Sequence, residues 1–237
     1  MEEIGKALKS IFDKLSDFFD IFDLSFFVSG FFTTIILLFW SLKRGIDLPI
    51  EVLNTHSIIA FILCCYINGL LCFALGRWIR MGIIGNIRDY LLKKKGNPKK
   101  FDSRFETILK AHEIDQEPNY KKYLEKPEYR GVWRLYVRLW ADIRNDEKYT
   151  SSRSFLGRYW VMSATYDGLS ISIFIALILF IESKFGLLIE KSIDISCSLF
   201  FVISGLLLVL FMVCLREAKR FERYQVEELV ATIASKK

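Results

Sequence analysis

The sequence predicts an all-α integral membrane protein with four transmembrane helices, an amphipathic N-terminal helix and a helical cytoplasmic insert. The first observation is four apolar blocks, at residues 24–42, 52–76, 159–181 and 195–215. Each is about as long as the roughly 20 residues that an α-helix needs to cross the hydrocarbon core. Asp167, in the third block, is the one acidic or basic side chain that the blocks contain. The second observation is that basic residues gather between the second and third blocks.

Composition supports a membrane protein over a soluble domain. In a soluble domain, the apolar residues, which make up 52% of the 237, would recur with a period of 2 or 3.6. Here they are continuous, as in helices that are apolar on all sides. The five cysteines lie within the blocks without a C-x-x-C pair, and the histidines are His56 and His112. We therefore expect no disulfide framework, no metal site and no cofactor. No nucleophile elbow, H-E-x-x-H, P-loop or dinucleotide motif occurs, so we expect no enzyme.

The first 23 residues predict an amphipathic helix. Their net charge is −3, and acidic and lysine side chains fill the face opposite the apolar one. Such a helix lies in the membrane surface or packs against a partner helix in an oligomer, and the sequence leaves both open. The apolar residues recur at helical spacing: Ile4, Leu8, Ile11, Phe12, Leu15, Phe18, Phe19 and Phe22.

The charge distribution predicts the topology. Residues 77–158 hold 20 Lys or Arg against 11 Asp or Glu, whereas the connectors at 43–51 and 182–194 hold few basic residues. Because basic residues near the ends of spans stay in the cytoplasm, we expect both termini and residues 77–158 on the cytoplasmic side of the cell membrane. The predicted domains are an N-terminal helix (1–23), transmembrane helices 1 and 2 (24–76), a cytoplasmic helical domain (77–158), transmembrane helices 3 and 4 (159–215) and a cytoplasmic C-terminal helix (216–237).

Breakers and capping residues divide the insert. We expect the second span to continue as a helix to about Lys95, where Gly96 and Pro98 follow. Ser103 with Glu106 forms a capping-box signature for a further helix. Residues 116–127 indicate a loop, and another helix follows at 128–145. The apolar face of that helix is predicted to hold Val132, Tyr136, Leu139 and Ile143.

Asp167 is the candidate functional residue. It lies nine residues past Arg158, roughly 13 Å along a helix, where a carboxylate is costly without a partner or water. Ser163 and Ser170 share its helical face, and Asn68 and Tyr66 in the second span are predicted at similar depth. These groups indicate either an ion or proton pathway or an inter-helix hydrogen bond that fixes packing.

Small residues mark the predicted packing seams. Gly30 in the first span, and Gly69 and Gly76 in the second, would let helix backbones approach closely in lipid. Every packed bundle contains such residues, so they do not identify a partner.

Two basic clusters indicate contact with lipid headgroups. One follows the second span. The other interleaves arginines with aromatic residues between 133 and 144, and here headgroup contact is favoured over a protein partner or nucleic acid. We expect no nucleic-acid partner. The headgroup-binding residues of the first cluster are predicted to be Arg77, Arg80, Lys93, Lys94 and Lys95.

These features together predict a homo-oligomeric channel, pore-forming or membrane-perturbing protein that is triggered through its cytoplasmic domain. Four spans with one buried acid leave little room for a path within one chain, so a pore would form between subunits. The alternative is a non-conducting anchor or sensor subunit of the inner membrane that recruits a cytosolic protein through residues 77–158. Bacterial antiviral systems contain small membrane effectors of this design, which is an analogy of architecture alone.

Overall fold

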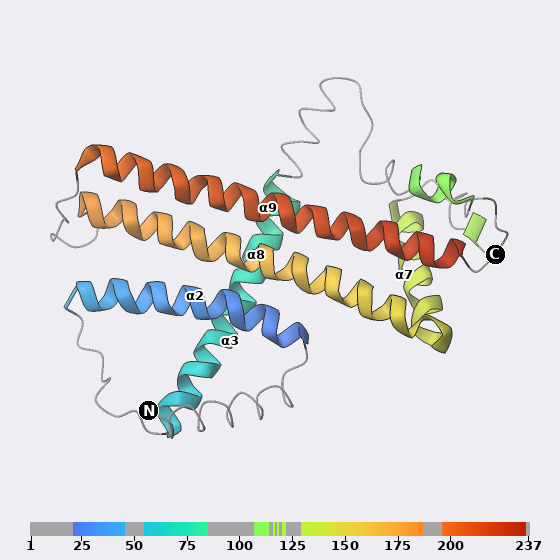
Figure 1. Cartoon of the computed structure of the whole chain (residues 1–237), viewed down its shortest axis with the longest axis horizontal. Coiled ribbons are helices and arrows are strands. Elements are labelled where there is room, and N and C mark those ends of the chain that lie inside the picture. Colours follow the sequence, from blue (N-terminus) through green and yellow to red (C-terminus); the bar gives the residue numbers. More distant parts are fainter. Residues whose placement is uncertain are drawn as a thin grey trace. The chain divides into compact units, whose positions relative to one another are not determined.

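The computed structural model describes residues 21–45, 55–84, 107–113, 116, 118, 120–121, 129–186 and 196–235. These residues form helices and turns, with no strand among them. Figure 1 labels the helices α2 (Ile21–Lys43), α3 (Thr55–Trp78), α7 (Tyr129–Asn145), α8 (Thr150–Phe185) and α9 (Cys197–Ala234). The π-helix η1 (Ile79–Ile84) follows α3, and the 3-10 turn η3 (Glu147–Tyr149) precedes α8. The predicted N-terminal helix lies outside the described residues except for its last three, which begin α2.

Four helices are long and apolar enough to cross a membrane, which indicates a multi-pass membrane protein. They comprise Ser25–Lys43, Ser57–Gly82, Glu147–Phe185 and Cys197–Ala234. The predicted blocks fall within them apart from residues at the block ends. The last two helices are much longer than a span needs: α8 has 36 residues and α9 has 38. Neither helix breaks where its apolar block meets the charged sequence.

The chain divides into two compact units. Unit 1 comprises Met1–Trp78 and Ala164–Ala218, and unit 2 comprises Ile79–Ser163 and Lys219–Lys237. The divisions fall close to the predicted ends of the apolar blocks. Unit 2 joins the predicted insert to the C-terminal helix, which the sequence had suggested as a separate segment.

Within unit 1, α8 and α9 are antiparallel neighbours, as expected for consecutive spans joined by a short connector. Phe174 lies against Phe211 with ring centroids 5.3 Å apart, and Phe180 stacks on Phe200 at 5.4 Å. By contrast, α2 runs in the same direction as α8 (Figure 1), because Thr33 in the middle of α2 contacts Ser172 and Trp40 near its end contacts Glu182, further along α8. These directions agree with four alternating crossings.

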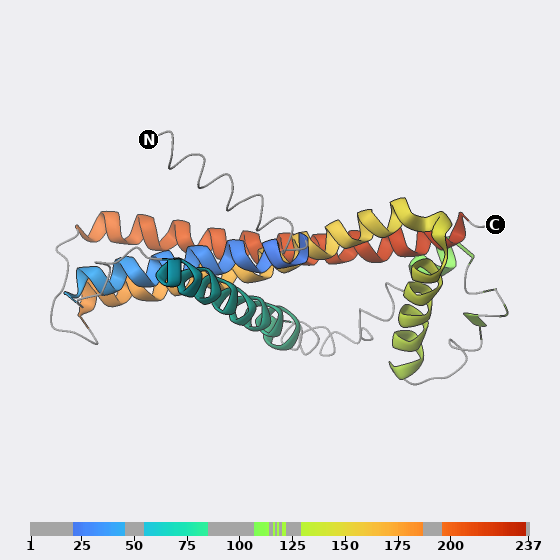
Figure 2. The same ribbon diagram turned by 90° about the horizontal axis from the view of Figure 1, so that it is seen from below.

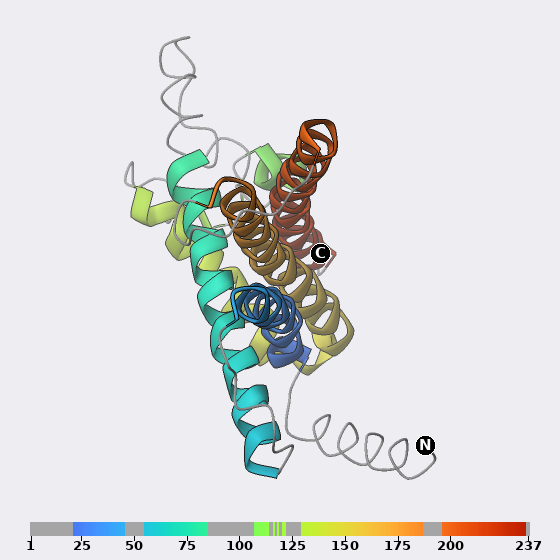
Figure 3. The same ribbon diagram turned by 90° about the vertical axis from the view of Figure 1, so that its left-hand side faces the viewer.

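The remaining helix of unit 1, α3, crosses α2 steeply instead of lying beside it (Figure 3). The backbones are closest at Gly30 and Gly69. A Cβ at Gly69 would collide with the carbonyl oxygen of Phe26, and one at Gly30 would collide with that of Cys65. Only glycine fits at such a crossing, which confirms that these two predicted small residues lie in a packing seam.

Large apolar side chains cover the outer surfaces of α3 and α9 in unit 1. On α3 they follow one stripe, and on α9 they surround most of the apolar stretch, as expected for helices that face hydrocarbon. The exposed residues include Ile59, Leu63, Ile67, Leu71 and Leu75 on α3, and Phe201, Val202, Leu206, Val209 and Met212 on α9.

Unit 2 has a soluble-type hydrophobic core where α7 crosses the adjoining parts of α8 and α9 (Figure 2). Leu139 and Ile143, which the sequence placed on the buried face of α7, are both fully buried. Tyr136 is only partly buried, and Leu135, which the prediction omitted, is fully buried. The complete core is Leu109, Leu135, Leu139, Ile143, Leu156, Val226, Leu229, Val230 and Ile233.

Candidate intramembrane polar site

A chain of hydrogen bonds joins three helices of unit 1. The Thr33 hydroxyl of α2 donates to Ser172 Oγ of α8 at 2.8 Å, and Ser172 donates to the Ser29 carbonyl oxygen at 2.9 Å. Cys72 of α3 brings its Sγ to 3.2 Å from Thr33 Oγ1. All four residues are buried. This hydroxyl cluster therefore satisfies its polar groups internally, as buried groups in lipid must.

A second hydrogen bond ties α3 to α2. Asn68 donates from Nδ2 to Thr34 Oγ1 at 2.9 Å and makes a longer contact of 3.6 Å with Cys64 Sγ. The sequence suggested Asp167 as a neighbour for Asn68, but the structure gives it Thr34 and Cys64. Tyr66, also predicted for this site, instead meets the ring of Phe26 edge-on, with centroids 6.4 Å apart.

Asp167 is almost completely buried, with 1% of its surface exposed. Its backbone lies against α3 at Gly76, where a Cβ would collide with the Asp167 carbonyl oxygen. Ser170, one of the two predicted neighbours, donates to that same oxygen at 2.7 Å. Ser163, the other, is buried and belongs to unit 2. The sequence therefore identified a buried acid correctly, and the structure adds that its helix contacts α3 through a backbone-to-backbone approach.

The helix register places Asp167 near the end of an apolar stretch. Extending the Phe174–Phe211 pair along the two antiparallel helices puts Asp167 level with Ala218, and extending the Phe180–Phe200 pair puts it level with Val213. Arg216, just beyond the last apolar block, is within this part of α9. The depth of Asp167 in a membrane, which the count from Arg158 put at roughly 13 Å, stays a prediction. The sequence lacked the pairing of α8 with α9, which sets the level of each residue.

An ionic network at the other end of these helices was missed by the sequence. Glu182, 4% exposed, accepts a hydrogen bond from Trp40 Nε1 at 3.0 Å. Arg44, whose side chain is 4% exposed, forms a salt bridge with the same carboxylate. Arg44 and Glu182 fall in the predicted connectors 43–51 and 182–194. The sequence did contain a signal for this ion pair. Arg44 and Glu182 carry opposite charges and directly follow the first and third blocks, and spans that alternate in direction put both block ends on the same side of the membrane.

The basic residues predicted to bind headgroups are in different environments. Arg77 is exposed, with its guanidinium 5.9 Å from the Phe73 ring centroid. Arg80 is buried in unit 2 and forms a salt bridge with Glu222 of α9, an arrangement that favours a structural role for it. Lys93, Lys94 and Lys95 lie outside the described residues. Headgroup binding by this cluster stays a prediction.

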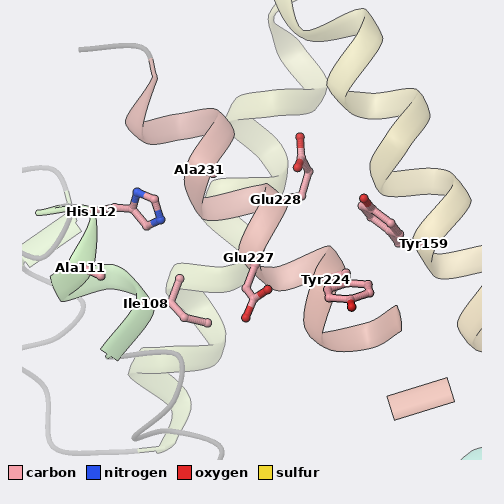
Figure 4. A pocket seen from close by; sticks show the side chains of 8 residues that line it. All are labelled: Ile108, Ala111, His112, Tyr159, Tyr224, Glu227, Glu228 and Ala231. Atoms are coloured by element: carbon pink, nitrogen blue, oxygen red, sulfur yellow. The ribbon is translucent and has the colours of Figure 1, made fainter. Parts of the chain in front are cut away.

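Unit 2 contains a groove of about 400 Å³ beside α9, which Figure 4 shows from close by. On its wall, the ring centroids of Tyr159 of α8 and Tyr224 of α9 lie 6.0 Å apart. Arg223 donates a hydrogen bond from Nε to Glu227 Oε1 at 2.6 Å. The short helical segment 107–111 contributes to the same wall. A molecule in this groove would touch α8, α9 and the insert together. The lining residues are Ile108, Ala111, His112, Tyr159, Tyr224, Glu227, Glu228 and Ala231.

Among the residues that the structure describes, no three His, Cys, Asp or Glu side chains converge as metal ligands. Comparison with protein-family models, curated proteins and solved structures gave no match.

Proposed function

We propose that this chain is a homo-oligomeric membrane effector that opens or perturbs the membrane when its cytoplasmic unit is engaged. One observation carries the proposal: α8 and α9 are each a single uninterrupted helix that serves both the apolar unit and the soluble-type core. A packed helix moves as a rigid element, so a displacement in the core is transmitted along it. The groove beside α9 supports this coupling, because its lining includes residues of both long helices.

The pore, in this proposal, lies between subunits. The polar groups of α2, α3 and α8 are hydrogen-bonded to one another, and Gly30 and Gly69 bring two backbones together. Such packing favours a closed seam within one chain over a conducting path. Subunits would contact one another through the exposed apolar surfaces of α3 and α9, and symmetric assembly is the usual way for small chains to build a path.

The proposed location is the cell membrane, with both termini and the insert in the cytoplasm. The charge asymmetry supports this orientation. A setting in bacterial antiviral defence has only the analogy of architecture in its favour. We propose no catalytic activity for the chain.

The alternative is a non-conducting anchor or sensor subunit. The same satisfied hydrogen bonds favour it, because an anchor needs a tightly packed apolar unit and no path. In that case the core and groove of unit 2 would recruit a cytosolic protein, and α8 and α9 would only hold it at the membrane.

Ion flux through reconstituted liposomes separates the two functions. Purified protein and its Asp167→Asn variant would be incorporated at equal density, and oligomer size would be checked by size-exclusion chromatography with light scattering. We expect flux from the wild type and altered flux from Asp167→Asn in an intact oligomer, because the variant removes charge and keeps shape. Asp167→Leu, which also removes hydrogen bonding, is expected to weaken the assembly itself.

Two results would reject the pore. A monomer at all detergent concentrations, or no flux above protein-free liposomes under any addition of cytosolic extract, would leave the anchor as the better account. Wild-type flux and stability in Asp167→Leu would remove Asp167 from the mechanism.

A further inference from the structure

Unit 2 contains the beginning of an apolar block. The third block starts at Tyr159, and its first five residues, 159–163, belong to unit 2. Arg158 directly precedes the block, and Tyr159 and Trp160 open it. Amphipathic rings of this kind favour the boundary between hydrocarbon and water. The change from charged to apolar sequence therefore falls within one compact unit and on one helix, α8.

Contacts between aromatic rings bring α9 to the same place within unit 2. The centroid of the Tyr159 ring lies 6.0 Å from that of Tyr224 and 6.4 Å from that of Phe221, and Figure 4 shows the two tyrosines. The rings of Phe221 and Tyr224 are themselves 6.2 Å apart. These contacts place this part of α9 beside the start of the third apolar block.

Two exposed arginines accompany the aromatic rings. Arg220 has its Cζ 5.3 Å from the centroid of the Tyr224 ring, and its Nε donates a hydrogen bond to the Tyr224 hydroxyl at 2.8 Å. Arg158 has its Cζ 5.7 Å from the centroid of the Phe155 ring. Both arginines are exposed to solvent. We call Phe155, Arg158, Tyr159, Arg220 and Tyr224 the arginine–aromatic edge.

The positive charge of Arg158 is available to an anion. Within the described part of the chain, Arg158 forms no ion pair. Two carboxylates of α9 in unit 2 are engaged by other arginines, because Glu222 forms a salt bridge with Arg80 and Glu227 forms one with Arg223. An anion at this edge would therefore have to come from outside the described residues.

The position of the edge selects a lipid headgroup as that anion. The helix α8 is long and apolar enough to cross a membrane, and the edge lies where its charged sequence meets the apolar block. For a spanning helix, this is the level of the headgroups. Phe155 is 49% exposed beside Arg158, and apolar surface next to a basic residue suits the boundary between headgroups and acyl chains. Guanidinium groups match phosphate oxygens with paired hydrogen bonds.

We propose that the arginine–aromatic edge binds the phosphate of an anionic membrane lipid. Neither Arg158 nor Arg220 is among the residues that the sequence predicted to bind headgroups. The proposal depends on α8 crossing the membrane, and it does not depend on whether the protein conducts ions. A failure of lipid binding and an absence of ion flux are therefore separate results.

The test is native mass spectrometry of the full chain in detergent, with equimolar phosphatidylglycerol and phosphatidylcholine. We expect the wild type to retain more phosphatidylglycerol. The ratio of the two bound lipids should fall by about fivefold for each arginine removed in Arg158→Ala/Arg220→Ala, because each basic residue near the surface attracts anionic lipid by about that factor. Arg158→Ala alone should lose about fivefold. This single variant breaks no hydrogen bond among the described residues, so it separates lipid binding from folding.

The matched control is Lys110→Ala/Lys148→Ala, which removes two exposed positive charges from other segments of unit 2. It should keep the wild-type ratio, and unchanged size-exclusion profiles would show that the variants are folded. The proposal fails if the wild type retains the two lipids equally, if Arg158→Ala keeps the wild-type ratio, or if the control loses as much as the arginine variants. It also fails if an excess of glycerol phosphate removes the preference for phosphatidylglycerol, since that would assign the edge to a soluble phosphate.

Discussion

Trp40 donates from its indole Nε1 to Glu182 Oε2 at 3.0 Å, across 142 residues of sequence. The same carboxylate forms a salt bridge with Arg44, and both charged side chains are almost completely buried. This network fixes the end of α2 against the end of α8. With the Thr33–Ser172 hydrogen bond nearer the start of α2, it defines the parallel pair that organises unit 1.

Breaking the buried ion pair on one side should be costly. We expect Glu182→Ala to lower the free energy of unfolding by about 3–5 kcal/mol, because it leaves the Arg44 guanidinium buried without its counter-charge. The double variant Arg44→Met/Glu182→Met should recover much of that loss. Thermal unfolding of detergent-purified protein measures both. If the double variant is as unstable as the sum of its single variants, the two side chains are not coupled.

The crossing of α2 and α3 should tolerate no side chain at Gly69. Gly69→Ala places a Cβ against the Phe26 carbonyl oxygen, so we expect overpacking to destabilise the protein by about 1–3 kcal/mol. Gly205→Ala is the control, because nothing lies within 4 Å of a Cβ there. In a helix interior it should be neutral or stabilise by up to about 1 kcal/mol. Equal melting temperatures for the two variants would show that the crossing is not as close as described.

The core of unit 2 should depend on Leu139. Truncation by Leu139→Ala removes a fully buried side chain and is expected to destabilise unit 2 by about 2–5 kcal/mol. Val137→Ala changes the same helix at a position that is 49% exposed, and its effect should stay within about 0.5 kcal/mol. Hydrogen exchange read by mass spectrometry should show faster exchange in α7 and in α9 after Lys219 for Leu139→Ala alone. Unchanged protection there would argue that α7 does not hold the C-terminal part of α9.

The orientation in the membrane can be tested with single cysteines. In a background without native cysteines, Lys184→Cys should react with an impermeant thiol reagent added to intact cells, whereas Lys219→Cys should react only after lysis. The basic residues that flank the blocks predict that Lys219 lies in the cytoplasm. Labelling of Lys219→Cys in intact cells would reverse the topology, and labelling of neither residue in lysed cells would mean that both sites are shielded.

Several features could be read from the sequence because they depend on local pattern. The length of the apolar blocks predicted the four candidate membrane-spanning helices. The spacing of apolar residues in 128–145 predicted α7, with Leu139 and Ile143 on its buried side. Glycines at Gly30 and Gly69 were recognised as seam residues because small side chains permit close packing anywhere. Asp167 was recognised because a lone carboxylate in an apolar block is conspicuous whatever its neighbours are.

The sequence alone therefore determined the helical class of the described residues, the four helices long and apolar enough to cross a membrane and the presence of a buried acid, since these follow from the length and polarity of each segment. Only the tertiary structure decided which groups meet. Asn68 pairs with Thr34, Glu182 with Trp40 and Arg44, and the C-terminal part of α9 completes the core of unit 2. The physical reason is register. In lipid, apolar helices can slide and rotate past one another at little cost, so their relative level is set by a few close backbone contacts and hydrogen bonds between segments far apart in sequence.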